Sequence, residues 1–361
     1  MIRILQIVNI MDRAGIENML MNYYRQIDRT KIQFDFLTHR PNEGAYDHEI
    51  NLLGGKVYHA PRLYPQNFKS YFKYMADFFE KHKEYTIVHS HIDAMSYLPL
   101  LAAKKAGVKI RIAHSHSTSI DRDFKWPLKQ YFRKRLPSVA TEFAACSKLA
   151  GKYLFNDNSV KIIYNAIDIG KFVYDERVRK KKREEFGLNG KFVIGHVGRF
   201  TEAKNHKFII EIFERVLLKK NSSVLLLVGN GELMDETNKY ISEKNLSNNV
   251  IILSDRDDVQ EIYQAMDVFV FPSKYEGLGM GAVEAEITGL VTYVSNKVPK
   301  EVKISDNLEF LKLNKEIWID KLLGLESYDR HTCYNKNYDI KEATMLLENY
   351  YIQLEEKMKT Q

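Results

Sequence analysis

The chain has 361 residues, 45% of them apolar and 28% charged, which is ordinary for a globular protein and long enough for two domains with separate cores. Its two cysteines, Cys146 and Cys333, exclude a disulfide framework and favour a reducing compartment. No window approaches the ~18 uncharged apolar residues of a membrane-spanning helix, and charges interrupt the apolar start too early for a signal peptide. We therefore expect a cytoplasmic protein.

Positive charge is concentrated in the first half of the chain. The net charge is +7, but residues 1–172 hold 26 Lys and Arg against 16 Asp and Glu, whereas the remainder holds 28 against 31. A basic surface of this kind can face nucleic acid, an anionic membrane or an anionic substrate.

The first part of the chain alternates between strand and helix patterns. Ile2–Ile10 is nearly continuously apolar, as in a parallel strand covered on both faces, and the loop 11–16 leads into an apolar-striped helix. Further elements are expected at Ile32–Thr38, Lys56–Tyr58 and Thr86–His89 (strands) and at about Phe68–His82 and Ala94–Ala106 (helices). The alternation predicts a doubly wound parallel sheet that binds ligands at the carboxyl ends of its strands.

Two His-Ser-His triplets stand at such strand ends, His89-Ser90-His91 and His114-Ser115-His116. Histidines two apart on an extended segment point the same way, so the four imidazoles can gather at a metal site, pack in the core or line a ligand cleft. No acidic or cysteine ligand accompanies them, and we expect no metal.

The segment Asp121–Leu136 interleaves aromatic and basic residues. Its cations are Arg122, Lys125, Lys129, Arg133, Lys134 and Arg135, and Trp126 is among its aromatic residues. This pattern is typical of an amphipathic helix that lies on an anionic bilayer, and equally of a surface helix with its aromatic side in the core. The first interpretation predicts a protein that is peripheral on the inner face of the cell membrane.

A strand at Glu142–Cys146 and a helix at Lys148–Phe155 continue the pattern, and a basic cluster follows at Arg177–Arg183. We expect a linker at about 172–190 and two domains, 1–172 and 173–338. A closing amphipathic helix at about 339–361 is expected to return to the first domain.

The second domain begins with a strand at Lys191–Val197, a turn at Gly198-Arg199-Phe200 and a helix at Phe208–Leu218. Arg199 and Lys204 stand between the strand end and the helix, where two cations can neutralise a diphosphate. Taken alone, an Arg and a Lys are more often solvated surface residues.

The stretch from Phe271 to Gly289 follows a buried strand and contains glycines at 277, 279 and 281 before a short helix that Gly289 can close. A glycine loop at a helix start suits a phosphate. Glu276 precedes the helix and Glu284 lies about one turn inside it, so both carboxylates can accept hydrogen bonds from sugar hydroxyls. The alternative is a capped surface helix with solvated acids.

The run Phe271-Pro-Ser-Lys-Tyr-Glu-Gly-Leu-Gly279 and the spacing Glu276-x7-Glu284 resemble the retaining, nucleotide-sugar-dependent glycosyltransferases of family 4. Similar matches occur at 142–172 and 191–208, and the resemblance covers nearly the whole chain. It departs at Ala14-Gly15, where the family has Gly-Gly, and at Asn165-Ala-Ile-Asp168, where it has Asn-Gly. The resemblance implies the GT-B fold, in which two Rossmann-like doubly wound domains face each other across a cleft that holds the active site.

The resemblance also implies residue roles. It assigns catalysis to Arg199, Lys204, Glu276 and His116, and donor binding to Gly15, Gly198, Arg199, Lys204, Arg256, Glu276, Gly277, Leu278, Gly279 and Glu284. It places His89, His91 and His114 on the acceptor side. No cofactor or metal is expected, because the nucleotide sugar, with UDP as the favoured nucleotide, is a substrate. The implied acceptor is a glycan or an undecaprenyl-type lipid-linked sugar in bacterial capsule or exopolysaccharide assembly.

Two other functions are compatible with parts of the sequence. A nucleotide-sugar epimerase or hydrolase of the same fold would process the donor alone. A nucleic-acid-binding protein would use the basic half through salt-sensitive contacts, but it would leave the glycine loops of the second domain without a role.

Overall fold

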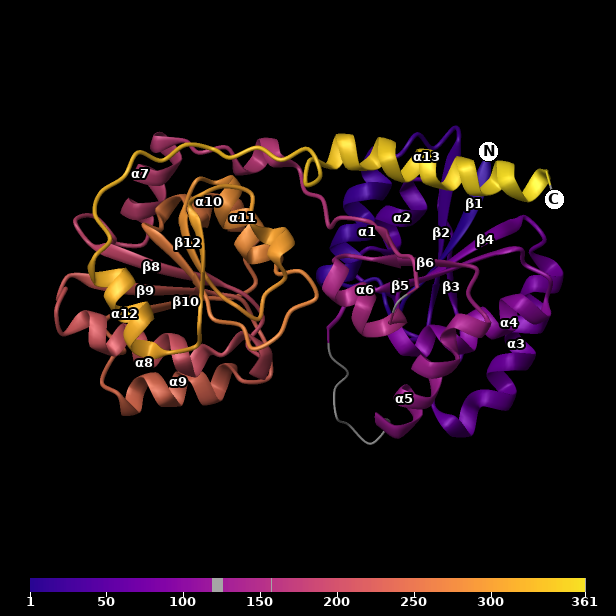
Figure 1. Cartoon of the computed structure of the whole chain (residues 1–361), viewed down its shortest axis with the longest axis horizontal. Helices are drawn as coiled ribbons and strands as arrows, with labels where there is room; N and C mark the ends of the chain where they lie inside the picture. Colours follow the sequence, from indigo (N-terminus) through magenta and orange to yellow (C-terminus); the bar gives the residue numbers. More distant parts are fainter. Residues whose placement is uncertain (119–125, 157, 361) are drawn as a thin grey trace. The chain divides into compact units, whose positions relative to one another are not determined.

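The computed structural model describes residues 1–118, 126–156 and 158–360, which form two compact units. The first comprises residues 1–168 together with 336–360, and the second comprises Ile169–Asn335 (Figure 1). The chain thus leaves the first unit after Asp168 and returns to it at Lys336.

The first unit is built on a seven-stranded sheet whose paired strands are all parallel. The spatial order is β3-β2-β1-β4-β5-β6-β7. The strands are β1 (Ile2–Ile7), β2 (Ile32–Thr38), β3 (Val57–His59), β4 (Tyr85–Ser90), β5 (Ile110–Ser115), β6 (Glu142–Ala145) and β7 (Lys161–Ile162). Since β1 pairs with both β2 and β4, the strand order reverses between β1 and β4, as in doubly wound folds.

Helices cover both faces of this sheet. One face carries α1 (Gly15–Gln26), α2 (Asp47–Leu52) and α13 (Ile340–Lys359), and the other carries α3 (Phe68–Lys81), α4 (Tyr97–Lys105), α5 (Trp126–Arg135) and α6 (Lys148–Phe155). Successive strand residues point to opposite faces, so Ile4 packs in the first layer and Leu5 in the second. Burial on both sides explains why the strands are nearly continuously apolar.

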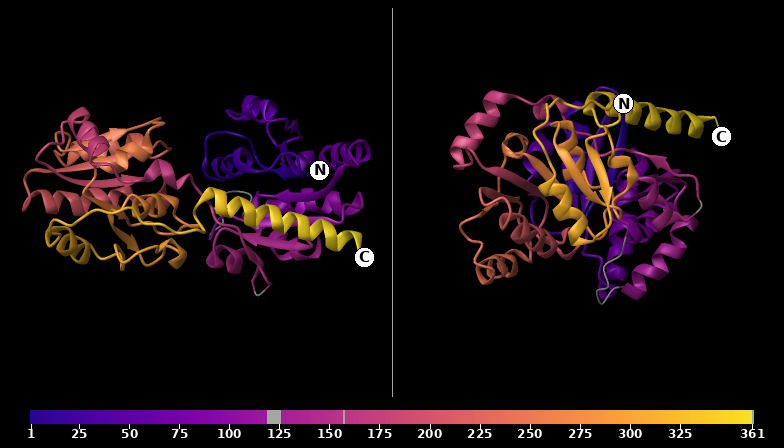
Figure 2. Two further views of the ribbon diagram at one scale, coloured as in Figure 1. Left: turned by 90° about the horizontal axis from the view of Figure 1, so that it is seen from above. Right: turned by 60° about the vertical axis from the view of Figure 1, so that its left-hand side comes forward.

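Helix α13 supplies part of the core of the first unit, although it comes from the far end of the chain (Figures 1 and 2). Tyr351 is 1% exposed, and its ring lies 6.0 Å from that of Phe34. A bridge between Ile167 and Asp339 joins the two segments at the point where the chain leaves and re-enters the unit.

The second unit has a six-stranded parallel sheet in the order β10-β9-β8-β11-β12-β13. Its strands are β8 (Phe192–Val197), β9 (Ser223–Val228), β10 (Val250–Leu253), β11 (Val268–Phe271), β12 (Val291–Ser295) and β13 (Leu308–Leu311). The order reverses between β8 and β11, so the expected fold class, doubly wound α/β, is confirmed for both units.

Helices also lie on both faces of the second sheet. One face packs against α8 (His206–Leu217), α9 (Met234–Glu243) and α12 (Lys315–Leu323). Figure 1 shows α7 (Glu176–Glu185), α10 (Val259–Ala265) and α11 (Met280–Ile287) on the opposite side. Among the described helices, none has an apolar stretch sufficient to cross a bilayer.

The expectation of a linker at about 172–190 is wrong for residues 176–185, which form α7. Arg183 is 9% exposed and donates to Asp267, to the Ala265 carbonyl and to the Leu188 carbonyl. Arg179 also pairs with Asp267. The basic run is therefore held at the start of β11, because Arg183 binds the Ala265 carbonyl and the Asp267 carboxylate, which are 82 and 84 residues away in the sequence.

Candidate active site

The second unit places a tight turn at the carboxyl end of β8, where Gly198, Arg199 and Phe200 follow the strand. The Gly198 N–H donates to the Val228 carbonyl at 2.9 Å, and the Phe200 N–H donates to the Asn230 carbonyl at 2.9 Å. A Cβ at Gly229, whose φ is +147°, would lie 2.2 Å from the Gly198 oxygen. Only glycine permits this approach of two turns, which holds Arg199 outward with 72% of its side chain exposed.

Lys204, in the short 3-10 helix Glu202–Lys204, lies beside Glu276. Its Nζ donates to Glu276 Oε1 at 2.6 Å and lies 4.5 Å from the centre of the Phe271 ring. The two paired side chains are 18% and 11% exposed. Arg199 Nε is 3.8 Å from a carboxylate oxygen of Glu232 at the exposed surface. The turn after β8 and the loop after β11 thus meet at a pair of opposite charges.

The glycine loop brings the first turn of α11 against the same strand ends. Gly279, at φ +107°, precedes the helix, and a Cβ there would lie 3.2 Å from the Phe271 ring. A Cβ at Gly281 would lie 2.8 Å from the Val197 carbonyl oxygen, and Leu278 is 3% exposed. The N-cap residue, Gly279, has no side chain with which to cap α11. An anion at this helix start would receive N–H groups and the positive end of the helix dipole.

Glu284 lies on α11 and accepts a hydrogen bond from the Tyr263 hydroxyl at 2.8 Å. Burial raises the pKa of Glu284 to about 7, although the hydrogen bond from Tyr263 and the charge of Lys204 both act to lower it. Tyr263, on α10, is a residue of this site that the sequence analysis did not identify. The sequence carries no signal for it, since a buried tyrosine on a helix is usually a core residue.

Two buried histidines support the Lys204 loop and were also not predicted. The His196 ring shares a hydrogen bond through Nδ1 with the Val270 carbonyl at 2.8 Å, and its Nε2 has no partner within the described residues. His206 stacks on Phe200 with the ring centres 4.1 Å apart. Burial lowers the pKa of both histidines, and nearby Lys204 acts in the same direction, so both rings are neutral beside the cation.

Arg256 follows β10 and lies in an ion-pair cluster. Its Nε donates to Asp258 at 2.7 Å and its Nη2 to Glu185 at 3.3 Å, and Lys182 also pairs with Asp258. These contacts tie α7 to the loop that carries Arg256, a predicted donor-binding residue.

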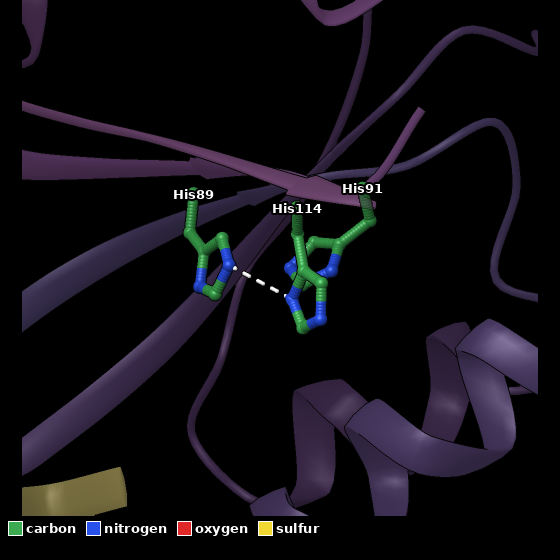
Figure 3. Close-up of side chains that lie close together, drawn as sticks. All are labelled: His89, His91 and His114. Atoms are coloured by element: carbon green, nitrogen blue, oxygen red, sulfur yellow. Dashed lines mark hydrogen bonds between the residues drawn. The ribbon is translucent and has the colours of Figure 1, made fainter. Parts of the chain in front are cut away.

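In the first unit the four histidines of the two triplets come together. Figure 3 shows His89, His91 and His114, of which His114 is 0% exposed and the other two are 1% exposed. His89 Nε2 lies 3.1 Å from His114 Nδ1, and His91 Nδ1 lies 3.0 Å from His116 Nε2. The His114 and His116 rings stack with centres 4.0 Å apart. Both triplets therefore build one imidazole cluster at the carboxyl ends of β4 and β5.

Hydrogen bonds determine which ring nitrogens of one imidazole pair carry protons. Gln6 Oε1 accepts from His91 Nε2 at 2.8 Å, so His91 Nδ1 is left as an acceptor for His116 Nε2–H. Burial lowers the pKa of His116 to about 3. His116 Nδ1 then carries an enclosed lone pair with no partner among the described residues.

A second set of hydrogen bonds involves His89. Its Nδ1 lies 2.7 Å from the Tyr351 hydroxyl of α13, and its Nε2 contacts His114 Nδ1. Ligand nitrogens of His89, His91 and His114 lie within 4.8 Å of one another, so these three residues are the ones that could hold a metal ion in this cluster. Both nitrogens of His89 and of His91, and Nδ1 of His114, lie within hydrogen-bond distance of neighbouring imidazoles, Gln6 or Tyr351, whereas His114 Nε2 is buried with no partner within the described residues.

The predicted membrane-docking segment forms α5 from Trp126 onward, whereas Arg122 and Lys125 lie outside the described residues. Phe132 is 4% exposed and packs on Tyr97, whereas Trp126 and Tyr131 are 39% and 50% exposed. Of these three aromatic residues of α5, only Phe132 faces the core.

Gly15, a predicted donor-binding residue, begins α1, and a Cβ there would meet no atom within 4 Å.

Two family models match the chain. The model described as Glycosyltransferase Family 4 matches residues 13–171, and the model described as Glycosyl transferases group 1 matches residues 178–312. The glycosyltransferase EpsF of Bacillus subtilis is 33% identical over 309 residues, covering 83% of this chain and 80% of that protein. An Escherichia coli protein named UDP-Gal:alpha-D-GlcNAc-diphosphoundecaprenol alpha-1,3-galactosyltransferase is 28% identical, covering 76% and 77%.

Solved structures agree with this relationship at the level of the fold. HepE of Anabaena, crystallised with UDP and glucose, superposes with a TM-score of 0.77 at 16% identity over 100% of both chains. This likeness confirms the GT-B fold class. The two family models and the EpsF relative together show that the chain belongs to the family 4 glycosyltransferases and is a glycosyltransferase.

Proposed function

We propose that the protein transfers a sugar from a UDP-sugar to a lipid-linked glycan acceptor, with retention of configuration at the anomeric carbon, in the assembly of a bacterial cell-surface polysaccharide such as a capsule or exopolysaccharide. The donor lies in the second unit, at the point where the strand order reverses between β8 and β11. Ligands of doubly wound sheets bind at such switch points.

The observation that carries this proposal is the pairing of Lys204 with Glu276 beside the glycine-rich start of α11. This largely buried ammonium and carboxylate neutralise each other until a substrate arrives. The donor diphosphate offers Lys204 a stronger anionic partner, and Glu276 then becomes available to accept hydrogen bonds from the hydroxyls of the donor sugar.

Catalysis follows from the charge of the leaving group. The bond between the anomeric carbon and the diphosphate oxygen breaks, and the diphosphate gains negative charge in the transition state. Arg199, Lys204 and the amino end of α11 are the groups that stabilise this charge. Glu284, held by Tyr263, accepts from a ribose hydroxyl. The reaction needs no metal, because the cations and the helix end handle the charge.

The acceptor side of the proposal rests on the first unit and on a relative. The Escherichia coli protein is named for a sugar attached to diphosphoundecaprenol. An acceptor of that kind is held in a membrane, and α5 presents exposed Trp126 and Tyr131 beside its basic residues. We assign α5 to peripheral contact with an anionic bilayer, next to the acceptor.

Calorimetry with UDP, GDP and ADP tests the donor site. We expect UDP to bind most tightly, and Lys204→Ala to weaken its binding at least about tenfold, as expected when a charge-assisted contact is lost. Lys207→Ala is the matched control, because Lys207 is an exposed cation on α8 that contacts the Tyr240 ring. Equal affinities of the two variants would contradict the diphosphate assignment.

A turnover assay separates sugar transfer from the hydrolase alternative. The protein is mixed with UDP-sugars, with and without membrane lipid extract as the acceptor source, and the release of UDP is measured. Transfer predicts that UDP release depends on the extract. Release at the same rate without extract would show that the donor is processed alone.

A further inference from the structure

The first unit contains a cationic pocket that has no role in the functional assignments above. It has a volume of about 220 Å³, and its lining includes Arg40, Arg62 and Lys129. Arg40 follows β2, Arg62 follows β3, and Lys129 lies on α5. The pocket therefore opens at the carboxyl edge of the parallel sheet, where doubly wound units bind their ligands.

The pocket and the histidine cluster lie on opposite faces of this sheet. Leu63 and Ile92, which line the pocket, belong to the apolar layer under α3 and α4. His89, in contrast, contacts Tyr351 of α13 in the other layer. The pocket is thus a separate site from the cluster that holds His116.

The charged side chains that line the pocket within the described residues are all cationic. They are Arg40, Arg62 and Lys129, and no carboxylate is among the described lining residues. Both Arg40 and Arg62 are exposed, and neither guanidinium has an ion pair or a hydrogen bond within the described part of the chain. Each guanidinium can donate two parallel N–H groups to one anionic group. Two of them at one concave site therefore fit the oxygens of a phosphate or diphosphate better than they fit the hydroxyls of an uncharged sugar.

The lining of the pocket includes a buried, uncharged histidine. The His39 ring is 3% exposed, with Nδ1 at 2.9 Å from the Val8 carbonyl oxygen and Nε2 at 3.3 Å from the Tyr71 hydroxyl. Burial lowers the pKa of His39 to about 4, so this residue adds no positive charge at neutral pH. The cationic character of the pocket therefore comes from Arg40, Arg62 and Lys129.

The position of Lys129 joins the pocket to α5, on which Trp126 and Tyr131 are exposed. A diphosphate that links a glycan to a lipid lies at the membrane surface, which is where an interfacial helix would also lie. We propose that Arg40, Arg62 and Lys129 bind the diphosphate group of the lipid-linked acceptor. This inference rests on the proposed transfer to such an acceptor, and it names the group by which the acceptor is held.

Vesicle binding by the full chain tests the inference. The probes are phosphatidylcholine vesicles doped with undecaprenyl diphosphate and, at equal surface charge, vesicles doped with phosphatidylglycerol. We expect the wild-type protein to bind the diphosphate vesicles at least about tenfold more tightly, in line with two or more charge-assisted contacts. Inorganic pyrophosphate, added with the donor site saturated by UDP, should displace the protein from them.

The variant Arg40→Ser/Arg62→Ser should lose this preference and bind both kinds of vesicle alike, whereas Arg40→Lys/Arg62→Lys should keep part of it. The matched control is Lys81→Ser/Lys109→Ser, which removes two exposed cations that precede β4 and β5 at the opposite edge of the sheet. This control should bind as the wild type does. Unchanged UDP affinity in every variant shows that the second unit remains folded, and an unchanged circular dichroism spectrum shows that the first unit, which carries the substitutions, does too.

Two results would overturn the inference. One is a preference for diphosphate vesicles that survives Arg40→Ser/Arg62→Ser. The other is equal binding of both vesicle types by the wild type, which would identify a general lipid-headgroup contact. Failure of the proposed function is a separate result, because it would appear as absent UDP binding or as UDP release that is independent of the acceptor.

Discussion

At the scale of single residues, the pair formed by Lys204 and Glu276 determines the chemistry proposed for the second unit. Each group is more than four-fifths buried, and each would be costly to leave unpaired. A substrate that brings its own negative charges can replace Glu276 as the partner of Lys204. Arg199 differs, because it is largely exposed and has only a 3.8 Å approach to Glu232, so it can turn toward a ligand at little cost.

Lys204→Ala and Arg199→Ala are each expected to lower kcat by about two orders of magnitude, the usual consequence of removing one donor that stabilises transition-state charge. Steady-state kinetics with the natural acceptor measures this, with Lys207→Ala as the control for a nearby cation. Near-normal turnover in both variants would refute their role at the leaving group.

Glu284 makes a prediction about pH. Its pKa is raised to about 7, so the side chain is mostly protonated at pH 6 and mostly ionised at pH 8. A carboxylate accepts stronger hydrogen bonds from hydroxyls than a carboxylic acid does, and donor affinity should therefore rise by several-fold between these pH values. Calorimetry with UDP-glucose checks this, since its phosphates stay ionised throughout. Glu284→Gln should bind more weakly at pH 8 and show no such rise.

The histidine cluster leads to a prediction about metal. Apart from His114 Nε2 and His116 Nδ1, its nitrogens already share hydrogen bonds, and the proposed reaction uses cations of the protein itself. We expect activity to survive an excess of chelator. Loss of activity that added divalent ion restores would assign the three histidines to a metal site instead.

At the scale of elements, α5 combines an anchored and an exposed side. Phe132 is buried against Tyr97, while the last turn carries Arg133, Lys134 and Arg135. Charge reversal of these three residues to Glu is expected to lower binding to anionic vesicles by at least about tenfold, because each cation near such a surface contributes about 1 kcal/mol. Co-sedimentation measures the change.

The matched control for α5 is reversal of Arg177, Lys180 and Lys181, three exposed cations of α7, to Glu. It changes the net charge equally but should leave vesicle binding unaltered. Equal losses in both triple variants would indicate a general charge effect, and no loss in the α5 variant would exclude this helix from membrane contact.

At the scale of the whole molecule, buried histidines make the protein sensitive to acid. Burial lowers the pKa of His39, His89, His91, His114, His116, His196 and His206. The unfolded chain binds these protons below pH ~6.5, whereas the folded protein binds them only at lower pH, at about pH 4 for His39 and His206 and about pH 3 for His116. Stability therefore falls as the pH falls below ~6.5. Glu17 and Glu284, with pKa values raised to about 7, act in the opposite direction.

Burial also raises the pKa of Asp47, Glu142 and Glu286. Because the seven histidines outnumber all five of these carboxyl groups, we expect a lower free energy of unfolding at pH 5 than at pH 7. Urea titrations followed by tyrosine and tryptophan fluorescence at several pH values measure this difference. Equal or greater stability at pH 5 would show that the carboxyl groups dominate.

Local patterns were sufficient to predict much of the fold. The strand at 32–38 has the expected bounds, the strand at 192–197 lies within the expected 191–197, and the helix at 280–287 lies between the glycines that bound it. These elements are specified by burial on both faces of a parallel sheet and by glycine conformations, which are properties of neighbouring residues.

The charged run at 176–185 could not be placed in this way. Arg183 donates a hydrogen bond to Asp267, which is 84 residues away in the sequence. A sequence alone cannot show which distant carboxylate will neutralise a basic segment. The same limit concealed Tyr263, which meets Glu284 across two helices, and Tyr351, which reaches His89 from 262 residues away.

By itself, the sequence determined the two alternating α/β units, the family, and the candidate residues at strand ends, because periodicity and short motifs are local. Only the tertiary structure decided that Lys204 pairs with Glu276, that both histidine triplets form one cluster, and that Arg40, Arg62 and Lys129 surround one pocket. These arrangements depend on how parallel strands order themselves in the sheet, which brings together loops that are distant along the chain.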